Sequence, residues 1–330
     1  MSTTKMTDAT RAARIHYHIQ RGAPPDSVME GPITLAISDF DGAHTGHAAL
    51  ARRAAALAGE RAARPVALLP WPSPAGGDNT AAPRLTTLEE RIERLRALGV
   101  FTDIVVVPAP SAPLAAPEAL ERVRALGDVR ALVCGEAPTG AALALLPPEA
   151  VALAVRAGVF AEALAEPADA LDGAEDASEP LGGRIGALVA AGRMAEATAA
   201  LGYAYTVTGE VIGGDRRGRL LGYPTANLRP DPSKIIPANG IYAARVRLPG
   251  EEAPRHAAVV SIGVRPTFGD GHHRQIEAYL LDAAFDLYGA WIAVEFVAWL
   301  RPELRFDSVE ALITQMDRDC EQSRRLLGVK

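Results

Sequence analysis

Lysine and cysteine are scarce in this 330-residue sequence. None of its three lysines (Lys5, Lys234 and Lys330) follows glycine in the spacing of a P-loop, which excludes a P-loop nucleoside triphosphatase. We expect Lys234 to be solvated in a loop. The two cysteines, Cys134 and Cys320, lie far apart in sequence and have no metal-type spacing, so neither a disulfide framework nor a zinc site is supported. Both are expected to be small buried apolar residues.

Charge and apolar content exclude two classes of partner. The formal net charge of −6 gives no basic surface for nucleic acid. No segment approaches the ~18 apolar residues of a membrane span, and residues 1–22 lack the apolar segment of a secretion signal. We therefore expect a cytoplasmic protein that binds neither nucleic acid nor a membrane. Because lysine is so rare, phosphate binding must rely on backbone amides, a metal ion or arginine.

The amino-terminal half has the pattern of an α/β domain. After a tail over residues 1–30, short apolar runs alternate with helical patterns as far as about residue 164. The runs predicted to be buried strands are 33–37, 66–69, 104–107 and 131–134. This alternation predicts a Rossmann-like domain with a parallel sheet over residues 31–201. The domain includes an acidic loop near 166–180 and an alanine-rich helix over about 185–201.

The carboxy-terminal half, residues 202–330, carries 12 of the 17 aromatic residues. Segments such as 205–212 and 241–248 alternate at period two and are separated by turns, which predicts a small antiparallel β-barrel. Capping residues at 307–308 predict the start of a last helix, whose apolar stripe is expected to pack on the barrel and not to form a cofactor site. That stripe consists of Val309, Leu312, Ile313, Met316 and Cys320.

Residues 218–227, which read G-R-L-L-G-Y-P-T-A-N, form the most informative segment. Glycines let backbone N–H groups approach phosphate oxygens, and the residue before proline takes an extended conformation. Thr225 and Asn227 are two apart, so they project to the same side of a strand, and their neutral oxygens suit Mg²⁺. We therefore predict a nucleotide- and phosphate-binding set, which consists of Gly213, Gly218, Gly222, Pro224, Thr225 and Asn227.

Further motifs follow in a fixed order. They are N-G-I-Y at 239–242, S-I-G-V-R-P-T-F at 261–268, I-E at 276–277, D-L-Y-G at 286–289 and L-R-P-E-L-R-F at 300–306. Together with the glycine-rich run they resemble riboflavin kinase over about residues 205–327.

This resemblance implies transfer of the γ-phosphoryl group of ATP to the ribityl hydroxyl of riboflavin, which gives FMN. It places Mg²⁺ and the phosphates at Thr225 and Asn227, and it assigns Glu277 as the catalytic base. That role suits phosphoryl transfer, in which positioning and charge neutralisation matter more than a strong base. For Arg301 the choice is between a contact with flavin or phosphate, which we expect, and a surface ion pair.

A second motif lies at residues 38–47, S-D-F-D-G-A-H-T-G-H, between a predicted strand and a predicted helix. It resembles the H-x-G-H signature of nucleotidyltransferases. His44 and His47, three apart at the start of a helix, would face the same phosphates, where the helix dipole favours anions. The two halves together resemble the bacterial bifunctional riboflavin kinase/FMN adenylyltransferase, also called FAD synthetase, over nearly the whole chain. The implied second reaction transfers AMP from ATP to FMN and releases pyrophosphate.

The amino-terminal half departs from that family at four motifs. Ser38 and Asp39 replace a Gly-Asn pair, and the carboxylate of Asp39 would repel a polyphosphate. Residues 69–74 lack the acid and the histidine of the family's T-F-D-P-H-P, and 135–140 lack the aromatics of G-E-D-F-x-F-G. At 181–186 only Arg184 remains of the S-S-T-R-I-R phosphate site. We expect the fold to be kept and adenylyl transfer to be weak or lost.

Three alternatives stay open. The chain is fully bifunctional, or it is a non-catalytic protein that binds flavin or nucleotide, or its amino-terminal half serves as a platform for self-association. The joint presence of Thr225, Asn227 and Glu277 argues against a non-catalytic protein. The expected ligands are ATP and ADP, riboflavin, FMN and Mg²⁺.

Overall fold

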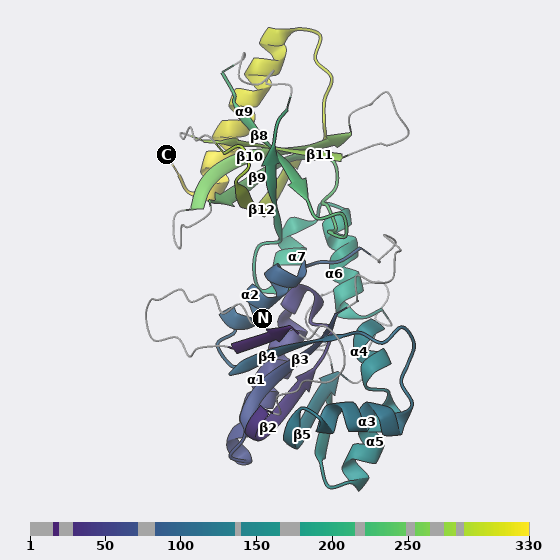
Figure 1. The fold of residues 1–330 in the computed structure, drawn as a ribbon. Coiled ribbons are helices and arrows are strands. Elements are labelled where there is room, and N and C mark those ends of the chain that lie inside the picture. Colours follow the sequence, from purple (N-terminus) through teal and green to yellow (C-terminus); the bar gives the residue numbers. More distant parts are fainter. Residues whose placement is uncertain are drawn as a thin grey trace. The chain divides into compact units, whose positions relative to one another are not determined.

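The computed structural model describes residues 16–19, 29–71, 83–135, 140–165, 179–214, 222–248, 255–264, 274–281 and 287–329. The chain forms two compact units (Figure 1). The first contains the described residues within 1–78 and 88–167, and the second contains those within 79–87 and 168–330. The predicted fold class is confirmed: a parallel α/β unit is followed by an antiparallel barrel and a carboxy-terminal helix.

The first unit is built on a six-stranded sheet in which every described pairing is parallel. Its spatial order is β1-β4-β3-β2-β5-β6. The strands are β1 (His16–Ile19), β2 (Met29–Ile37), β3 (Arg64–Trp71), β4 (Asp103–Pro108), β5 (Gly127–Gly135) and β6 (Phe160–Leu164). Strand β1 lies inside residues 1–30, for which we expected a tail, because Tyr17 and Ile19 suit a strand that extends the edge beside β4.

Helices cover both faces of this sheet. The side chains of strand β2 are buried on both of its faces. Ile33 and Ile37 pack in one core cluster with residues of α3 and α5, whereas Ala36 packs in another with residues of α1 and α2. The helical elements are η1 (Asp41–Ala43), α1 (Thr45–Glu60), α2 (Leu88–Ala97), α3 (Ala116–Arg124), α4 (Gly140–Leu145) and α5 (Pro148–Arg156). Parallel strands buried on both faces read as continuous apolar runs, which is the pattern seen in the sequence.

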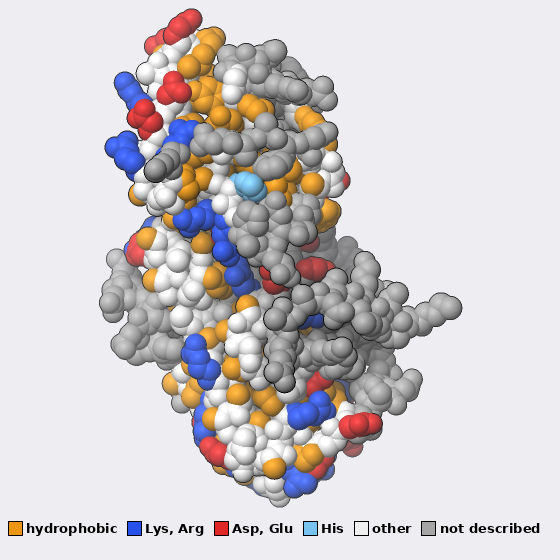
Figure 2. Space-filling model, turned by 90° about the vertical axis from the view of Figure 1, so that its left-hand side faces the viewer, with side chains coloured by type: hydrophobic (Ala, Val, Ile, Leu, Met, Phe, Trp, Pro, Cys, Tyr) orange, Lys and Arg blue, Asp and Glu red, His pale blue; other side chains and the backbone are white. Residues whose placement is uncertain are grey.

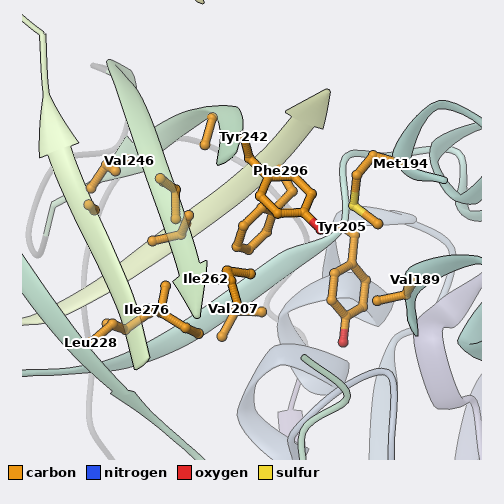
Figure 3. Close-up of a cluster of buried hydrophobic side chains, with 14 of the residues drawn as sticks. Val189, Met194, Tyr205, Val207, Leu228, Tyr242, Val246, Ile262, Ile276 and Phe296 are labelled. Carbon is orange, nitrogen blue, oxygen red and sulfur yellow. The ribbon is translucent and has the colours of Figure 1, made fainter. Parts of the chain in front are cut away.

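The second unit is a closed antiparallel barrel with the order β10-β11-β8-β7-β12-β9. Its strands are β7 (Thr206–Ile212), β8 (Thr225–Pro230), β9 (Gly240–Arg247), β10 (Arg255–Val264), β11 (Arg274–Leu280) and β12 (Trp291–Arg301). Alternate residues of the strands fill the interior, among them Val207, Leu228, Val246 and Ile276, which Figure 3 labels. Helix α9 (Val309–Leu327) begins where the sequence predicts, because the hydroxyl of Ser308 accepts a hydrogen bond from the N–H of Ala311.

The alanine-rich segment before the barrel differs from the expected single helix. It forms α6 (Leu181–Ala190) and α7 (Met194–Leu201), and between them Gly192 has a φ of 76°. Val189 and Met194 from these helices lie beside Tyr205 (Figure 3) and belong to the same buried cluster as the barrel interior. The compact unit that holds the barrel therefore includes residues before position 202.

Lys234 contradicts the expectation of a solvated loop residue. Its side chain is buried, its ammonium group donates to the carbonyl of Leu85, and it lies 4.8 Å from the centroid of the Tyr205 ring. Arg84 forms an isolated β-bridge with Lys234, and this pairing brings the neighbouring Leu85 to Lys234 from a distant part of the sequence. Both cysteines are free and buried, as expected. In the part of the chain that the structure describes, no helix is long and apolar enough to cross a membrane.

Candidate functional site

Strands β8 and β11 bring three predicted site residues to one place. In their antiparallel register, Glu277 lies opposite Asn227 and Tyr279 lies opposite Thr225. Residues directly opposite each other share a face of the sheet. The alternate residues of these strands, such as Leu228 and Ile276, point into the barrel. Thr225, Asn227 and Glu277 therefore share the outer face, where the Thr225 hydroxyl lies 3.3 Å from a carboxylate oxygen of Glu277.

The predicted glycines differ in what they do in the structure. A Cβ at Gly214 would overlap the side-chain amide of Asn227, so the close approach at this point requires glycine. Gly222 has a φ of 88°, a left-handed conformation that favours glycine, just before the chain enters β8. A Cβ at Gly213 would meet nothing within 4 Å. Gly218 lies outside the described residues.

A cavity of about 250 Å³ opens beside Thr225 and Glu277, between the barrel and α9. Its wall is largely apolar, which suits a flat aromatic ligand. The residues that line it are Tyr223, Thr225, Ile241, Val259, Ser261, Glu277, Tyr279, Arg301, Glu303, Leu304, Phe306, Leu312, Met316, Asp319 and Cys320. On the face shown in Figure 2, apolar side chains gather in the upper part of the view, which contains α9 and the barrel.

Arg301 lies in the wall of this cavity with most of its donors engaged. Its guanidinium donates from Nε to Oδ1 of Asp319 at 2.9 Å and from Nη2 to Oδ2 at 2.6 Å, while Nη1 donates to the carbonyl of Pro302. The amide of Gln315 donates to the same carboxylate at 3.0 Å. The pair fixes α9 against the end of β12, and a contact between Arg301 and a ligand stays a prediction.

Sequence reasoning missed several residues of the cavity. Tyr223 donates a 2.5 Å hydrogen bond to Asp317 of α9, and Ser261 lies opposite Glu277 in the register of β10 and β11. The carboxylate of Glu303 occupies the space that a Cβ at Gly263 would take. Tyr223 is part of the Y-P-T-A-N run, which marked its importance, but nothing local in the sequence pairs it with Asp317.

The donor set on the outer face fits a magnesium ion. Within the described ranges, no group of three or more histidine, cysteine, aspartate and glutamate side chains forms a metal site. Thr225 and Asn227 offer a hydroxyl and an amide oxygen on the face that also carries Glu277. Mg²⁺ keeps several waters and takes many of its ligands from substrate phosphates, so few protein ligands are needed.

His44, which is buried, and the partly buried His47 lie together at the start of α1. Their rings stack with centroids 3.8 Å apart, and the Nδ1 of His44 accepts a hydrogen bond from the backbone N–H of His47. Burial, followed by the neighbouring His47, lowers the pKa of His44 to about 2. Burial, followed by Arg91, lowers the pKa of His47 to about 3. Both imidazoles are therefore neutral near pH 7. The Nε2 of His47 lies 3.0 Å from the hydroxyl of Ser38.

Arg91 is held by the strand-to-helix turn of the same motif. This buried guanidinium donates to the carbonyl of Asp39 and to the carboxylate of Asp41, each at 2.5 Å, and it lies 4.8 Å from the centroid of the Trp71 ring. Burial raises the pKa of Asp39, and the positive charge of Arg91 opposes that shift. Residues 72–74 and 136–139, which include positions that depart from the family pattern, lie outside the described residues. Arg184 lies on α6.

The fold combines a parallel α/β unit with a closed antiparallel barrel, and the outer face of the barrel carries Thr225, Asn227 and Glu277 next to a cavity. Comparisons with known proteins agree. Residues 201–327 match the family described as riboflavin kinase, and residues 28–120 match the family described as FAD synthetase. The chain belongs to the family of bacterial bifunctional riboflavin kinase/FMN adenylyltransferases.

Two relatives and one solved structure illustrate the similarity. The bifunctional riboflavin kinase/FMN adenylyltransferase of Listeria monocytogenes is 31% identical over 305 residues, which cover 88% of this chain and 91% of the relative. The protein of that name from Escherichia coli K12 is 39% identical over 136 residues, 41% of this chain and 42% of the relative. A Streptococcus pneumoniae crystal structure named a macrolide-efflux protein matches with a TM-score of 0.73 and 26% identity, covering 94% of this chain and 99% of that chain.

Proposed function

We propose that the barrel unit makes FMN by transferring the γ-phosphoryl group of ATP to riboflavin, with Glu277 as the base. The observation that carries this proposal is the placement of Thr225, Asn227 and Glu277 on one outer face, where Thr225 and Glu277 line a largely apolar cavity. Family membership supports the same reaction and the same substrates. The cavity wall, with Tyr279 and Met316, would hold the flavin ring, and the open face beside Glu277 would receive the ribityl chain.

In this proposal the residues position the reactants and move one proton. Glu277 orients the terminal ribityl hydroxyl and accepts its proton as that oxygen bonds to the γ-phosphorus, while the bond from the γ-phosphorus to the leaving ADP oxygen breaks. The hydroxyl of Thr225 fixes the rotamer of Glu277. A magnesium ion held through Thr225 and Asn227 would neutralise charge on the phosphates.

The replacement Glu277→Gln tests the base. Glutamine keeps the size of the side chain and an oxygen for Thr225 but cannot accept the proton, so kcat should fall by about 10²–10⁴-fold while the KM for ATP changes little. Glu321→Gln is the matched control, since Glu321 is an exposed acid on α9 outside the cavity lining. Wild-type kcat in Glu277→Gln would refute the role of Glu277, and a wild-type protein that makes no FMN would refute the kinase proposal.

For the amino-terminal unit we infer that FMN adenylyl transfer is weak or lost. The support is electrostatic. Arg91 already donates to the backbone carbonyl of Asp39 and to the carboxylate of Asp41, and the Nε2 of His47 lies 3.0 Å from the hydroxyl of Ser38. A polyphosphate at this turn would have to displace these contacts and would meet the Asp39 carboxylate.

One assay that follows riboflavin, FMN and FAD together separates the candidates. We expect FMN to accumulate from riboflavin and ATP with little FAD. FAD formation that His47→Ala abolishes would show a fully bifunctional enzyme, and tight riboflavin binding without turnover would show a non-catalytic binding protein. Self-association through the amino-terminal half and a cytoplasmic location stay predictions.

A further inference from the structure

Tyr223 contacts both strands of the candidate kinase site. Its ring packs against Tyr279 with centroids 5.1 Å apart and planes at 65°. Tyr279 lies opposite Thr225 in the sheet and two residues after Glu277, so these side chains share the outer face. In the chain, Tyr223 stands two residues before Thr225. Its position is therefore tied to the strand that carries Thr225 and to the strand that carries Glu277.

The hydroxyl of Tyr223 also reaches the helix on the opposite wall of the cavity. It donates a 2.5 Å hydrogen bond to Oδ1 of Asp317 on α9. Only 9% of Tyr223 is exposed, whereas Asp317 is exposed on the outer side of the helix. Because the acceptor is a carboxylate, the hydrogen bond is charge-assisted and stronger than one between neutral groups. Two residues further along the same helix, Asp319 pairs with Arg301. These bonds therefore hold the wall of the cavity that α9 forms in place relative to Tyr223, which lies just before the start of β8.

The backbone beside Tyr223 is stiff, so its position is transmitted to Thr225. Pro224, whose ring locks φ near −65°, is the single residue between Tyr223 and Thr225. A shift of the Tyr223 ring would therefore move the Thr225 hydroxyl, which lies 3.3 Å from Glu277. Phosphoryl transfer depends on placement, and an error of about 1 Å is enough to lower its rate substantially.

From these contacts we propose that the hydrogen bond between Tyr223 and Asp317 is a positioning pair for phosphoryl transfer, which holds Thr225 and Glu277 in register with the flavin wall formed by α9. This proposal rests on the proposed riboflavin kinase activity. Neither residue touches the reacting atoms. Their role is to fix the distance between the phosphate side and the flavin side of the site.

A double-mutant cycle in the full-length protein tests the pair. Tyr223→Phe keeps the ring packed on Tyr279 and removes only the hydroxyl, and Asp317→Ala removes only the acceptor. Each should lower kcat for FMN formation about tenfold with little change in the KM for ATP. Because both changes delete the same bond, the double variant should also lose about tenfold, not about a hundredfold. Asp317→Asn keeps an oxygen acceptor and should recover most of kcat.

Melting temperatures and the control Glu321→Gln separate positioning from simple stability. The control should match wild type in kcat and in melting temperature. The proposal is overturned if the single variants melt earlier but keep wild-type kcat, if only the KM for riboflavin rises, or if the losses of the two single variants multiply in the double variant. A wild-type protein without FMN formation would overturn both this proposal and the kinase function, whereas an active wild type with unaffected variants would overturn the positioning role alone.

Discussion

Removing the carboxylate of Asp319 should destabilise the barrel unit by a measurable and calculable amount. Asp319 and Arg301 keep only 4% and 16% of their side chains exposed. The carboxylate accepts from Nε and Nη2 of Arg301 and from the amide of Gln315. The replacement Asp319→Ala leaves a nearly buried guanidinium without its counter-ion and the Gln315 amide without this acceptor.

The expected cost follows from that burial. Deleting one partner of a buried ion pair costs about 3–5 kcal/mol, because the other charge stays desolvated and uncompensated. Arg301 keeps its bond to the carbonyl of Pro302 and a little solvent contact, which places the cost near the lower limit of about 3 kcal/mol. That is a decrease of more than about a hundredfold in the folding equilibrium constant.

Urea unfolding followed by tryptophan fluorescence measures this loss, since Trp291 and Trp299 both lie on β12. The control Glu196→Gln removes an exposed partner of Arg193 in the same unit and should cause no measurable change. The double variant Arg301→Met with Asp319→Leu should recover most of the loss, because a packed apolar pair has no charge to desolvate. The reasoning is refuted if Asp319→Ala unfolds at the same urea concentration as the control, or if the double variant is less stable than Asp319→Ala.

Two further predictions concern the two candidate sites. Gly214→Ala should displace the amide of Asn227 and raise the Mg²⁺ concentration needed for half-maximal FMN formation. The melting temperature should not change. If the Mg²⁺ requirement also stays the same, Asn227 does not belong to the metal site. His44 and His47 have native pKa values of about 2 and 3, below the ordinary 6.5, so the unfolded chain binds more protons below pH 6.5 and stability falls as the pH drops from 6.5 toward 3. Each contributes up to about 2 kcal/mol of this loss between pH 7 and 5, whereas the raised pKa of Asp39 acts in the opposite direction. Denaturation of His47→Gln should therefore depend less on pH than that of wild type, and equal pH slopes would contradict the assignment.

Local patterns predicted most of the fold. Alternation of apolar runs with helical segments gave the parallel sheet, and period-two segments with aromatic residues gave the barrel. The cap at Ser308 placed the start of α9. The features that were missed depend on contacts between distant segments. Lys234 is buried because Leu85, 149 residues away, supplies its acceptor. The break between α6 and α7 depends on the conformation of Gly192, and glycine inside a helical pattern does not by itself reveal a break.

For the candidate kinase site, the sequence supplied the residues and the structure supplied their relation. The spacing of Thr225 and Asn227 placed both on one side of a strand. The register that sets Glu277 opposite Asn227 joins residues 50 positions apart, and the bond from Tyr223 to Asp317 spans 94. Neither register nor a long-range hydrogen bond has a local sequence signal. The sequence also does not reveal that Asp319 is the partner of Arg301, although an ion pair is one of the two roles that the sequence leaves open for Arg301.

The two units differ in where their polar groups are directed, and this difference bears on which reaction each can support. On the barrel, Thr225, Asn227 and Glu277 share the outer face, and Thr225 and Glu277 line a cavity, so a ligand can reach these two without breaking a strong internal bond. In the α/β unit, the guanidinium of Arg91 is buried and already satisfied by the turn at Asp39 and Asp41. Hydrogen bonds and charges that are already paired must be broken before they can bind substrate, and that cost subtracts from the affinity. We therefore expect Asp39→Asn, which removes the carboxylate nearest to the histidine pair, to increase FAD formation; a lower rate in this variant would show that Asp39 assists adenylyl transfer and would reverse our inference for this unit.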